Sequence, residues 1–108
     1  MKFLPVLLVA VASVAAHAQA APDWRAVLMD LYRIDMAFDA CKNVTPAGAD
    51  MIRLETVIAY VEEKSGYEED ELDELYGDVE REAAAPDEFC ARMSDAVTRL
   101  QAVPQEYR

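Results

Sequence analysis

The sequence predicts an all-α protein: a small antiparallel bundle of about four helices with one disulfide, behind an N-terminal signal peptide. Three observations support this prediction. Apolar residues recur every three or four positions, which is the period of a helix face. Glycine occurs only three times in 108 residues, and there are two cysteines, an even number. We therefore expect two parts, a signal peptide over residues 1–20 and one acidic helical domain over residues 21–108.

The first twenty residues have the three-part pattern of a secretory signal. Lys2 precedes an apolar run over residues 3–14, and small residues follow. Cleavage after Ala18 or after Ala20 fits the pattern, and we favour Ala20 because it removes the whole alanine-rich tail. The apolar run of about 12 residues is shorter than the roughly 20 that span a bilayer. We expect a periplasmic or secreted domain without a stable membrane span.

The first helix of the domain is predicted over residues 23–42, with Asp23 as its N-cap. Its apolar positions are three or four residues apart and mark one face: Trp24, Val27, Leu31, Ile34, Phe38 and Cys41. Asp35 and Asp39 lie one turn apart on this helix. A paired-carboxylate enzyme needs acids that face each other across a cleft, so a solvated helix face is the better interpretation of the two.

The second helix is predicted to begin at Thr45-Pro46, since threonine caps helices and proline suits the first turn. Gly66 is expected to end it. Its inner face is predicted to contain Met51, Leu54, Ile58 and Val61.

A third helix is predicted to follow directly, because Ser65 and Glu68 have the S-x-x-E spacing of a capping box. Its apolar stripe consists of Leu72, Leu75, Tyr76 and Val79, and Gly77 weakens it by about 1 kcal/mol relative to alanine. The fourth helix is predicted from about Pro86 to Val103, and Pro104 ends it. Its inner face begins at Phe89 or Cys90 and continues through Met93, Val97 and Leu100.

Cys41 and Cys90 fall on apolar faces of the first and fourth predicted helices. An exported chain with two cysteines favours one intramolecular disulfide. The bridge would close a loop of about 50 residues, worth roughly 4 kcal/mol in the chain-entropy description. The alternatives are two free thiols and a bridge between molecules.

The charge of the domain is strongly negative. Without Lys2 there are nine basic and 21 acidic residues, a net charge of −12. Nine of these net charges lie in residues 62–82. Such a charge argues against nucleic acid and anionic lipid as partners, and favours a basic partner or a cation.

The densest acidic cluster opens the third predicted helix. Glu68, Glu69, Asp70, Asp73, Glu74 and Asp78 are candidates for weak calcium binding or for contact with a basic partner. The spacing of an EF-hand loop is absent, so the alternative is a solvated first turn that favours the helix dipole. Several of these acids are four residues apart and repel each other. We therefore predict that this helix is the least stable one at neutral pH and low salt.

Little in the sequence suggests catalysis. The only histidine, His17, lies in the predicted signal peptide, and there is no C-x-x-C or phosphate-binding glycine loop. We predict no catalytic residue, no metal centre and no cofactor. Aromatic side chains with a polar tip suit interfaces, so four residues are candidates for a partner-facing rim: Trp24, Tyr60, Tyr67 and Tyr76. The alternative is that these side chains are half-buried against the core.

Two functional hypotheses follow from these observations. The first is a non-enzymatic interaction protein of the cell envelope, which acts as an adaptor, inhibitor or subunit by binding another protein. The second is an acid- or cation-responsive periplasmic protein, either chaperone-like or weakly calcium-binding. The plan of the chain, a small exported helical protein with one long-range disulfide, resembles the periplasmic acid-stress chaperones in architecture. That resemblance implies a protein that loosens at low pH and exposes apolar surface.

Overall fold

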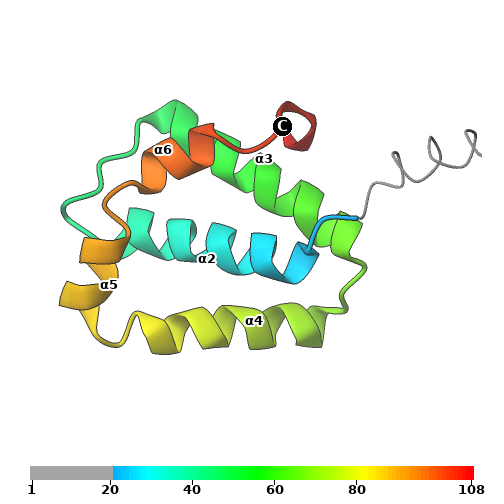
Figure 1. Cartoon of the computed structure of the whole chain (residues 1–108), viewed down its shortest axis with the longest axis horizontal. Coiled ribbons are helices and arrows are strands. Elements are labelled where there is room, and N and C mark those ends of the chain that lie inside the picture. Colours follow the sequence, from blue (N-terminus) through cyan, green and yellow to red (C-terminus); the bar gives the residue numbers. More distant parts are fainter. Residues whose placement is uncertain (1–20) are drawn as a thin grey trace, which may run out of the picture.

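A computed structural model describes residues 21–108 and shows an all-helical domain (Figure 1). The predicted signal peptide lies outside the described residues. No strand and no helix that is long and apolar enough to cross a membrane occurs within residues 21–108. The elements in chain order are α2 (Trp24–Ala40), α3 (Gly48–Ser65), α4 (Glu69–Glu82), α5 (Pro86–Arg92), α6 (Ala96–Gln101) and a final 3-10 turn, η1 (Gln105–Tyr107). The predicted fold class is confirmed.

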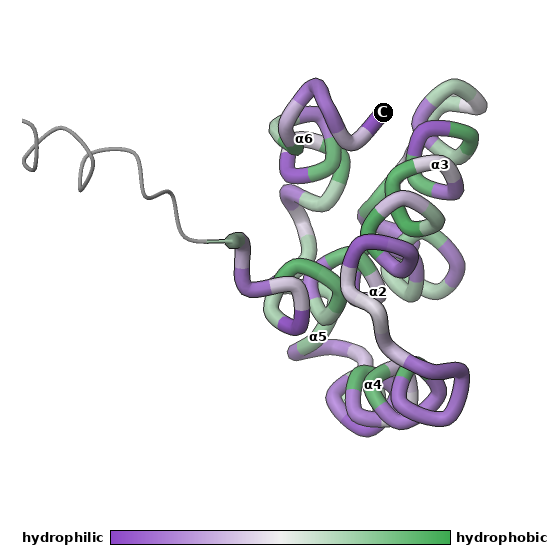
Figure 2. Tube along the Cα trace, turned by 90° about the vertical axis from the view of Figure 1, so that its right-hand side faces the viewer, coloured by the Kyte–Doolittle hydropathy of each residue, from purple (hydrophilic) through white to green (hydrophobic). Residues whose placement is uncertain are grey.

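Helix α2 is the central element of the domain. It packs against α3, α4 and α6, which surround it in the view of Figure 2. Asp23 caps it as predicted, since the Asp23 carboxylate accepts the backbone N–H of Ala26 at 3.1 Å. The buried arc of α2 is wider than the predicted stripe and includes Leu28 and Tyr32. A helix with neighbours on three sides buries more than one face, which a single-stripe pattern does not reveal.

The start and inner face of α3 differ from the prediction. Thr45-Pro46 does not begin the helix. The N-cap of α3 is Ala47, whose backbone N–H donates to the Asp50 carboxylate at 2.8 Å. A carboxylate in the first turn satisfies an N–H that the helix itself leaves free, so the helix starts there. Met51 was expected on the inner face but is 49% exposed. The inner face instead contains Val57, together with the predicted Leu54 and Val61.

The junction of α3 and α4 is close to the predicted place but is capped differently. Gly66 ends α3 with a φ of 71°, the left-handed conformation that favours glycine. The predicted capping box of Ser65 and Glu68 is wrong. The Ser65 hydroxyl instead accepts the N–H of Tyr67 at 3.1 Å, and the Glu71 carboxylate accepts the N–H of Glu68 at 2.9 Å. The capping box is therefore formed by Glu68 and Glu71 instead of Ser65 and Glu68, three residues later in the chain, because the acidic run also provides a carboxylate at position 71.

The fourth predicted helix is divided into α5 and α6. The break follows Arg92, whose backbone carbonyl accepts from the Arg99 guanidinium at 3.2 Å. The same guanidinium contacts the Met93 sulfur at 3.1 Å and donates to the Asp30 carboxylate of α2 at 2.6 Å. Phe89 before the break and Leu100 after it are both buried. The break thus lets two short helices each bury side chains in the core. Arg99 provides a hydrogen-bond donor for the Arg92 carbonyl, which the end of α5 leaves without a helical partner.

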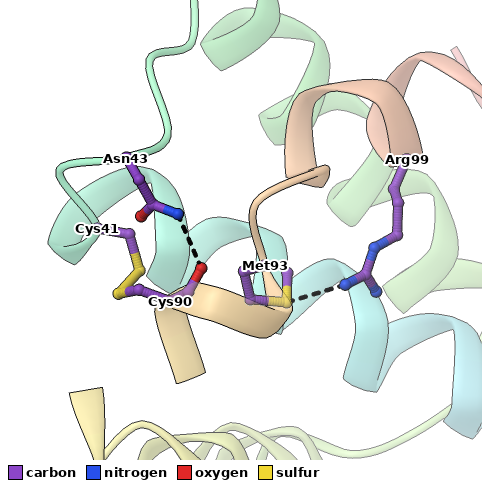
Figure 3. The surroundings of a disulfide bond; sticks show 5 residues. All are labelled: Cys41, Asn43, Cys90, Met93 and Arg99. Carbon is purple, nitrogen blue, oxygen red and sulfur yellow. Dashed lines mark hydrogen bonds between the residues drawn. A yellow bond between two sulfur atoms is a disulfide. The ribbon is translucent and has the colours of Figure 1, made fainter. Parts of the chain in front are cut away.

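The predicted disulfide is present between Cys41, directly after α2, and Cys90 in α5 (Figure 3). The two Cα atoms are 5.4 Å apart. Cys41 is buried and Cys90 is partly exposed. The Asn43 side chain adds a second link beside the bridge, because its amide donates to the Cys90 carbonyl at 3.0 Å. The bridge therefore fastens the C-terminal part of the chain to the end of the central helix.

The two halves of α4 differ in how their charges are compensated. In the C-terminal half, Glu82 forms a two-pronged ion pair with Arg33 of α2, at 2.7 and 2.9 Å. Asp78 contacts Arg81, and also Arg25 of α2 at 3.6 Å. In the N-terminal half, none of the acids has an ion pair with any residue of the described chain: Glu69, Asp70, Glu71, Asp73 and Glu74. The repulsion predicted for this helix is thus concentrated in its first two turns.

Removing the disulfide is expected to lower the free energy of unfolding by about 4 kcal/mol, because the unfolded chain then regains the entropy of a loop of about 50 residues. Urea denaturation of the Cys41→Ala, Cys90→Ala double variant measures this change. The reduced wild-type protein provides the control and should unfold at the same urea concentration as the variant. Equal midpoints for the variant and the oxidised wild type would contradict the prediction.

Backbone hydrogen exchange at neutral pH and low salt is expected to be fastest, among the three long helices, in the first two turns of α4. The uncompensated carboxylates repel each other there, and added salt screens this repulsion. Protection of this segment should therefore increase with ionic strength, while protection of α2 stays constant. The prediction fails if α4 is as protected as α2 at low salt.

Candidate functional site: an acidic groove along α2

A groove lies between α2 and α3, and its larger part is also lined by α4. It consists of two adjoining hollows that share Asp35 and Ile58. The larger hollow, about 350 Å³, is here called the tyrosine pocket and is lined by Tyr32, Asp35, Ile58, Glu62, Glu69, Leu72, Asp73 and Tyr76. The smaller one, about 80 Å³, is called the methionine slot and is lined by Asp35, Phe38, Asp39, Met51, Leu54, Glu55 and Ile58. Together they form the acidic groove.

The charge of this groove has a single sign. Six carboxylates contribute to its lining, and no lysine or arginine does: Asp35, Asp39, Glu55, Glu62, Glu69 and Asp73. Between these acids lie apolar side chains such as Phe38, Ile58 and Leu72. The groove therefore combines an apolar floor with a negative potential, a combination that suits a ligand with both apolar and cationic parts.

Two tyrosines form a wall of the tyrosine pocket. The rings of Tyr32 and Tyr76 meet edge to face with centroids 5.2 Å apart. The Tyr32 hydroxyl donates to the Glu62 carboxylate at 2.6 Å, and the Tyr76 hydroxyl makes a long contact of 3.5 Å with the Asp35 carboxylate. Burial raises the pKa of both phenols, and the neighbouring carboxylates raise it further. Both hydroxyls thus stay protonated at neutral pH and hold the carboxylates in place.

Asp35 lies where the two hollows meet, and its surroundings raise its pKa. Burial raises its pKa, and the negative charge of Asp39 one turn away raises it further. The Tyr76 hydroxyl acts in the opposite direction by donating to the charged form. The net result is a carboxylate that takes up a proton at a higher pH than an exposed aspartate does.

The side chains of the groove can bind a cation and can hold a proton. Carboxylates supply charge, and the faces of tyrosine rings attract positive groups such as the side chains of lysine and arginine. Within residues 21–108, no three His, Cys, Asp or Glu side chains converge in a way that could hold a metal ion.

The structure distributes the predicted acidic cluster over different surroundings. Glu69 and Asp73 line the tyrosine pocket. Asp78 faces the arginines described above. All of the other members are exposed, and three of them, Glu68, Asp70 and Glu74, line neither hollow. Only two of the six predicted residues therefore belong to the groove.

The predicted aromatic rim is also divided. Tyr76 lines the groove, whereas Trp24 and Tyr60 pack on Tyr107 of η1 with ring centroids 5.8 and 5.2 Å away. Tyr67 is half-buried against the core at the α3–α4 junction. Trp24 and Tyr60 thus hold the C-terminal turn against the ends of α2 and α3, while Tyr76 serves the candidate site.

Glu62, Asp35 and Tyr32 complete the groove, although sequence reasoning did not assign them to a site. A signal for two of them exists in the sequence: Tyr32, Asp35 and Asp39 recur at helical spacing beside the predicted apolar stripe. Glu62 comes from another helix. Its place opposite Tyr32 depends on how α3 packs on α2, which no local pattern specifies.

Comparison with known proteins finds no family model, no curated protein and no solved structure that matches this chain.

The free energy of unfolding is expected to rise as the pH falls from neutral into mild acid, and to decline in stronger acid. The raised pKa of Asp35 means that the folded state binds this proton more tightly than the unfolded chain, so acidification favours folding. Arg33 lowers the pKa of Glu82, whose stabilising contribution is therefore lost only at lower pH.

Thermal melts across this pH range test the prediction. Asp35→Asn keeps an acceptor for Tyr76 and removes the charge, so it should raise the melting temperature at neutral pH and flatten the rise in mild acid. A melting temperature of the wild type that falls steadily from neutral pH downward would contradict this assignment.

Proposed function

We propose that this chain is an exported, non-enzymatic interaction protein of the cell envelope that binds a basic segment of another protein in the acidic groove. The observation that carries the proposal is the composition of the groove. Six carboxylates and two tyrosines surround an apolar floor, and no basic side chain of the lining neutralises them. A partner of opposite charge would supply that compensation.

Export is part of the proposal and rests on two features. The first is the signal-like pattern of residues 1–20. The second is the disulfide between Cys41 and Cys90, since disulfides persist in oxidising compartments such as the periplasm and the cell exterior. Both features support a domain that works outside the cytoplasm.

A lysine or arginine side chain of the partner would enter the tyrosine pocket. There it would lie against the half-buried ring of Tyr76 and close to the carboxylates of Glu69 and Asp73. Each partly exposed charge pair contributes up to about 1 kcal/mol, and a cation over a tyrosine ring contributes a similar amount. Several such contacts are needed, so the affinity should depend strongly on salt.

An acid-responsive role is the second candidate, and the position of Asp35 favours it. Asp35 belongs to both hollows, and its pKa is raised by burial and by Asp39. Acidification would remove its negative charge and weaken the attraction for a basic partner. Release of a basic partner at low pH would mean that the chain both binds a partner and responds to acid. A binding constant that is unchanged between neutral and mildly acidic pH would exclude the acid-responsive role and leave partner binding as the proposed function.

Titration with a lysine-rich peptide of about 15 residues tests the proposed function. The Glu69→Gln, Asp73→Asn double variant removes two charges from the tyrosine pocket and should weaken binding about fivefold. The matched control is Asp87→Asn, Glu88→Gln, which removes two exposed charges from α5, away from the groove. An equal loss in both variants would show that only net charge matters and would contradict a site in the groove.

A further inference from the structure

We infer that a further hollow of the domain binds the oxyanion of a carboxylate or phosphate ligand. This arginine hollow, about 600 Å³ in volume, is lined by Arg33, Glu82, Arg92, Met93 and Arg99. None of these residues lines the acidic groove. The inference therefore concerns a separate site and goes beyond the proposed function.

The charge of the arginine hollow is opposite to that of the acidic groove. Three of the nine basic residues within residues 21–108 line it, against one carboxylate, Glu82. The arginines come from three helices, α2, α5 and α6, so they are brought together by the fold and not by one stretch of sequence. A hollow with more guanidinium groups than carboxylates attracts anions locally, even though the domain as a whole is negative.

Arg99 is held in place by groups outside the arginine hollow. Its Nε donates to Asp95 at 3.1 Å and its Nη1 to Asp30 at 2.6 Å, and neither carboxylate lines the hollow. Its Nη2 contacts the Met93 sulfur at 3.1 Å (Figure 3). These contacts balance the charge of Arg99 and fix its guanidinium. The donors for a ligand must therefore come from the other two arginines.

Arg33 and Arg92 supply these donors. Glu82 accepts from Nε and Nη2 of Arg33 at 2.7 and 2.9 Å, which leaves the two N–H groups of Nη1 outside this pair. Arg92 is exposed and forms no ion pair within residues 21–108. Its guanidinium lies over the Phe89 ring, 5.9 Å from the ring centroid. Arg92 is thus an arginine of the hollow without a counter-ion in the described chain.

The charge of Arg92 acts on the Arg33–Glu82 pair. The pKa of Glu82 is lowered mainly by the hydrogen bond from Arg33, and the charge of Arg92 lowers it further. Glu82 therefore stays ionised at neutral pH and keeps Arg33 in place. An anion between Arg33 and Arg92 would supply the counter-ion that Arg92 lacks, while Glu82 remains bonded to Arg33.

The geometry of arginine sets the class of ligand. A guanidinium presents its N–H groups in a planar fork that matches the paired oxygens of a carboxylate or a phosphate. A neutral or cationic ligand would leave Arg92 without a counter-ion. A polyanion would be repelled by the rest of the surface, since residues 21–108 carry a net charge of −12. A single carboxylate or phosphate group satisfies both conditions.

NMR titration of the disulfide-bonded protein with sodium acetate and, separately, with sodium phosphate tests the inference. Sodium chloride keeps the ionic strength constant, so that general screening is the same at every point. Saturable shifts of the Nε–H signals of Arg33 and Arg92 are expected, at millimolar concentrations because the site is partly exposed. Saturation by acetate alone would assign the site to carboxylates, and saturation by phosphate alone to phosphorylated ligands. No saturable shift with either anion overturns the inference.

Matched variants distinguish a site from an effect of net charge. Arg92→Gln should weaken binding of the anion about fivefold, and Arg92→Lys, which keeps the charge but loses the fork, about threefold. The control is Arg25→Gln, which removes the charge of an exposed arginine of α2 outside the hollow and should leave the affinity unchanged. Melting temperatures show that each variant is folded. Equal affinities of Arg92→Gln and Arg25→Gln overturn the inference.

Discussion

The burial of α2 is the constraint on which the rest of the structure depends. Four of its side chains, Leu28, Leu31, Ile34 and Ala37, are almost completely removed from solvent. Helices α3, α4 and α6 each pack on it, and the disulfide fixes α5 to its C-terminal end. A domain of this size buries a modest core, so concentrating the core around one helix is an efficient arrangement. The other helices need to contribute only one apolar stripe each.

The same arrangement explains where the few basic residues are used. Arg33 reaches from α2 to Glu82 of α4, and Arg99 reaches from α6 to Asp30 of α2. The first pair links α2 to the C-terminal end of α4, and the second links α2 to α6. Residues 21–108 contain nine basic residues against 21 acids, so arginines used in this way are not available elsewhere. The carboxylates are the only charged side chains that line the acidic groove.

Two of the six carboxylates that line the groove, Asp35 and Glu62, are partly buried. Carboxylates on a fully solvated helix face titrate in their usual range and interact weakly because water screens them. Asp35 is different, because its partial burial and the charge of Asp39 raise its pKa, although the phenol of Tyr76 opposes this by donating to the charged form. The fold thus converts part of a highly charged surface into a site that favours positive charge and responds to protons.

The sequence by itself determined the helical class, the disulfide partners and the approximate extent of α2, α3 and α4, because helical periodicity, cysteine count and a left-handed glycine at Gly66 are local signals. The sequence did not predict the caps of α3 and α4, because several acids and hydroxyls there can accept from the same N–H groups. It also did not predict the break after Arg92, where Arg99 of α6 donates to the Arg92 carbonyl. The groove was decided only by tertiary structure. Tyr32 and Glu62 are 30 residues apart, and only the packing of α3 on α2 brings the hydroxyl of one to the carboxylate of the other.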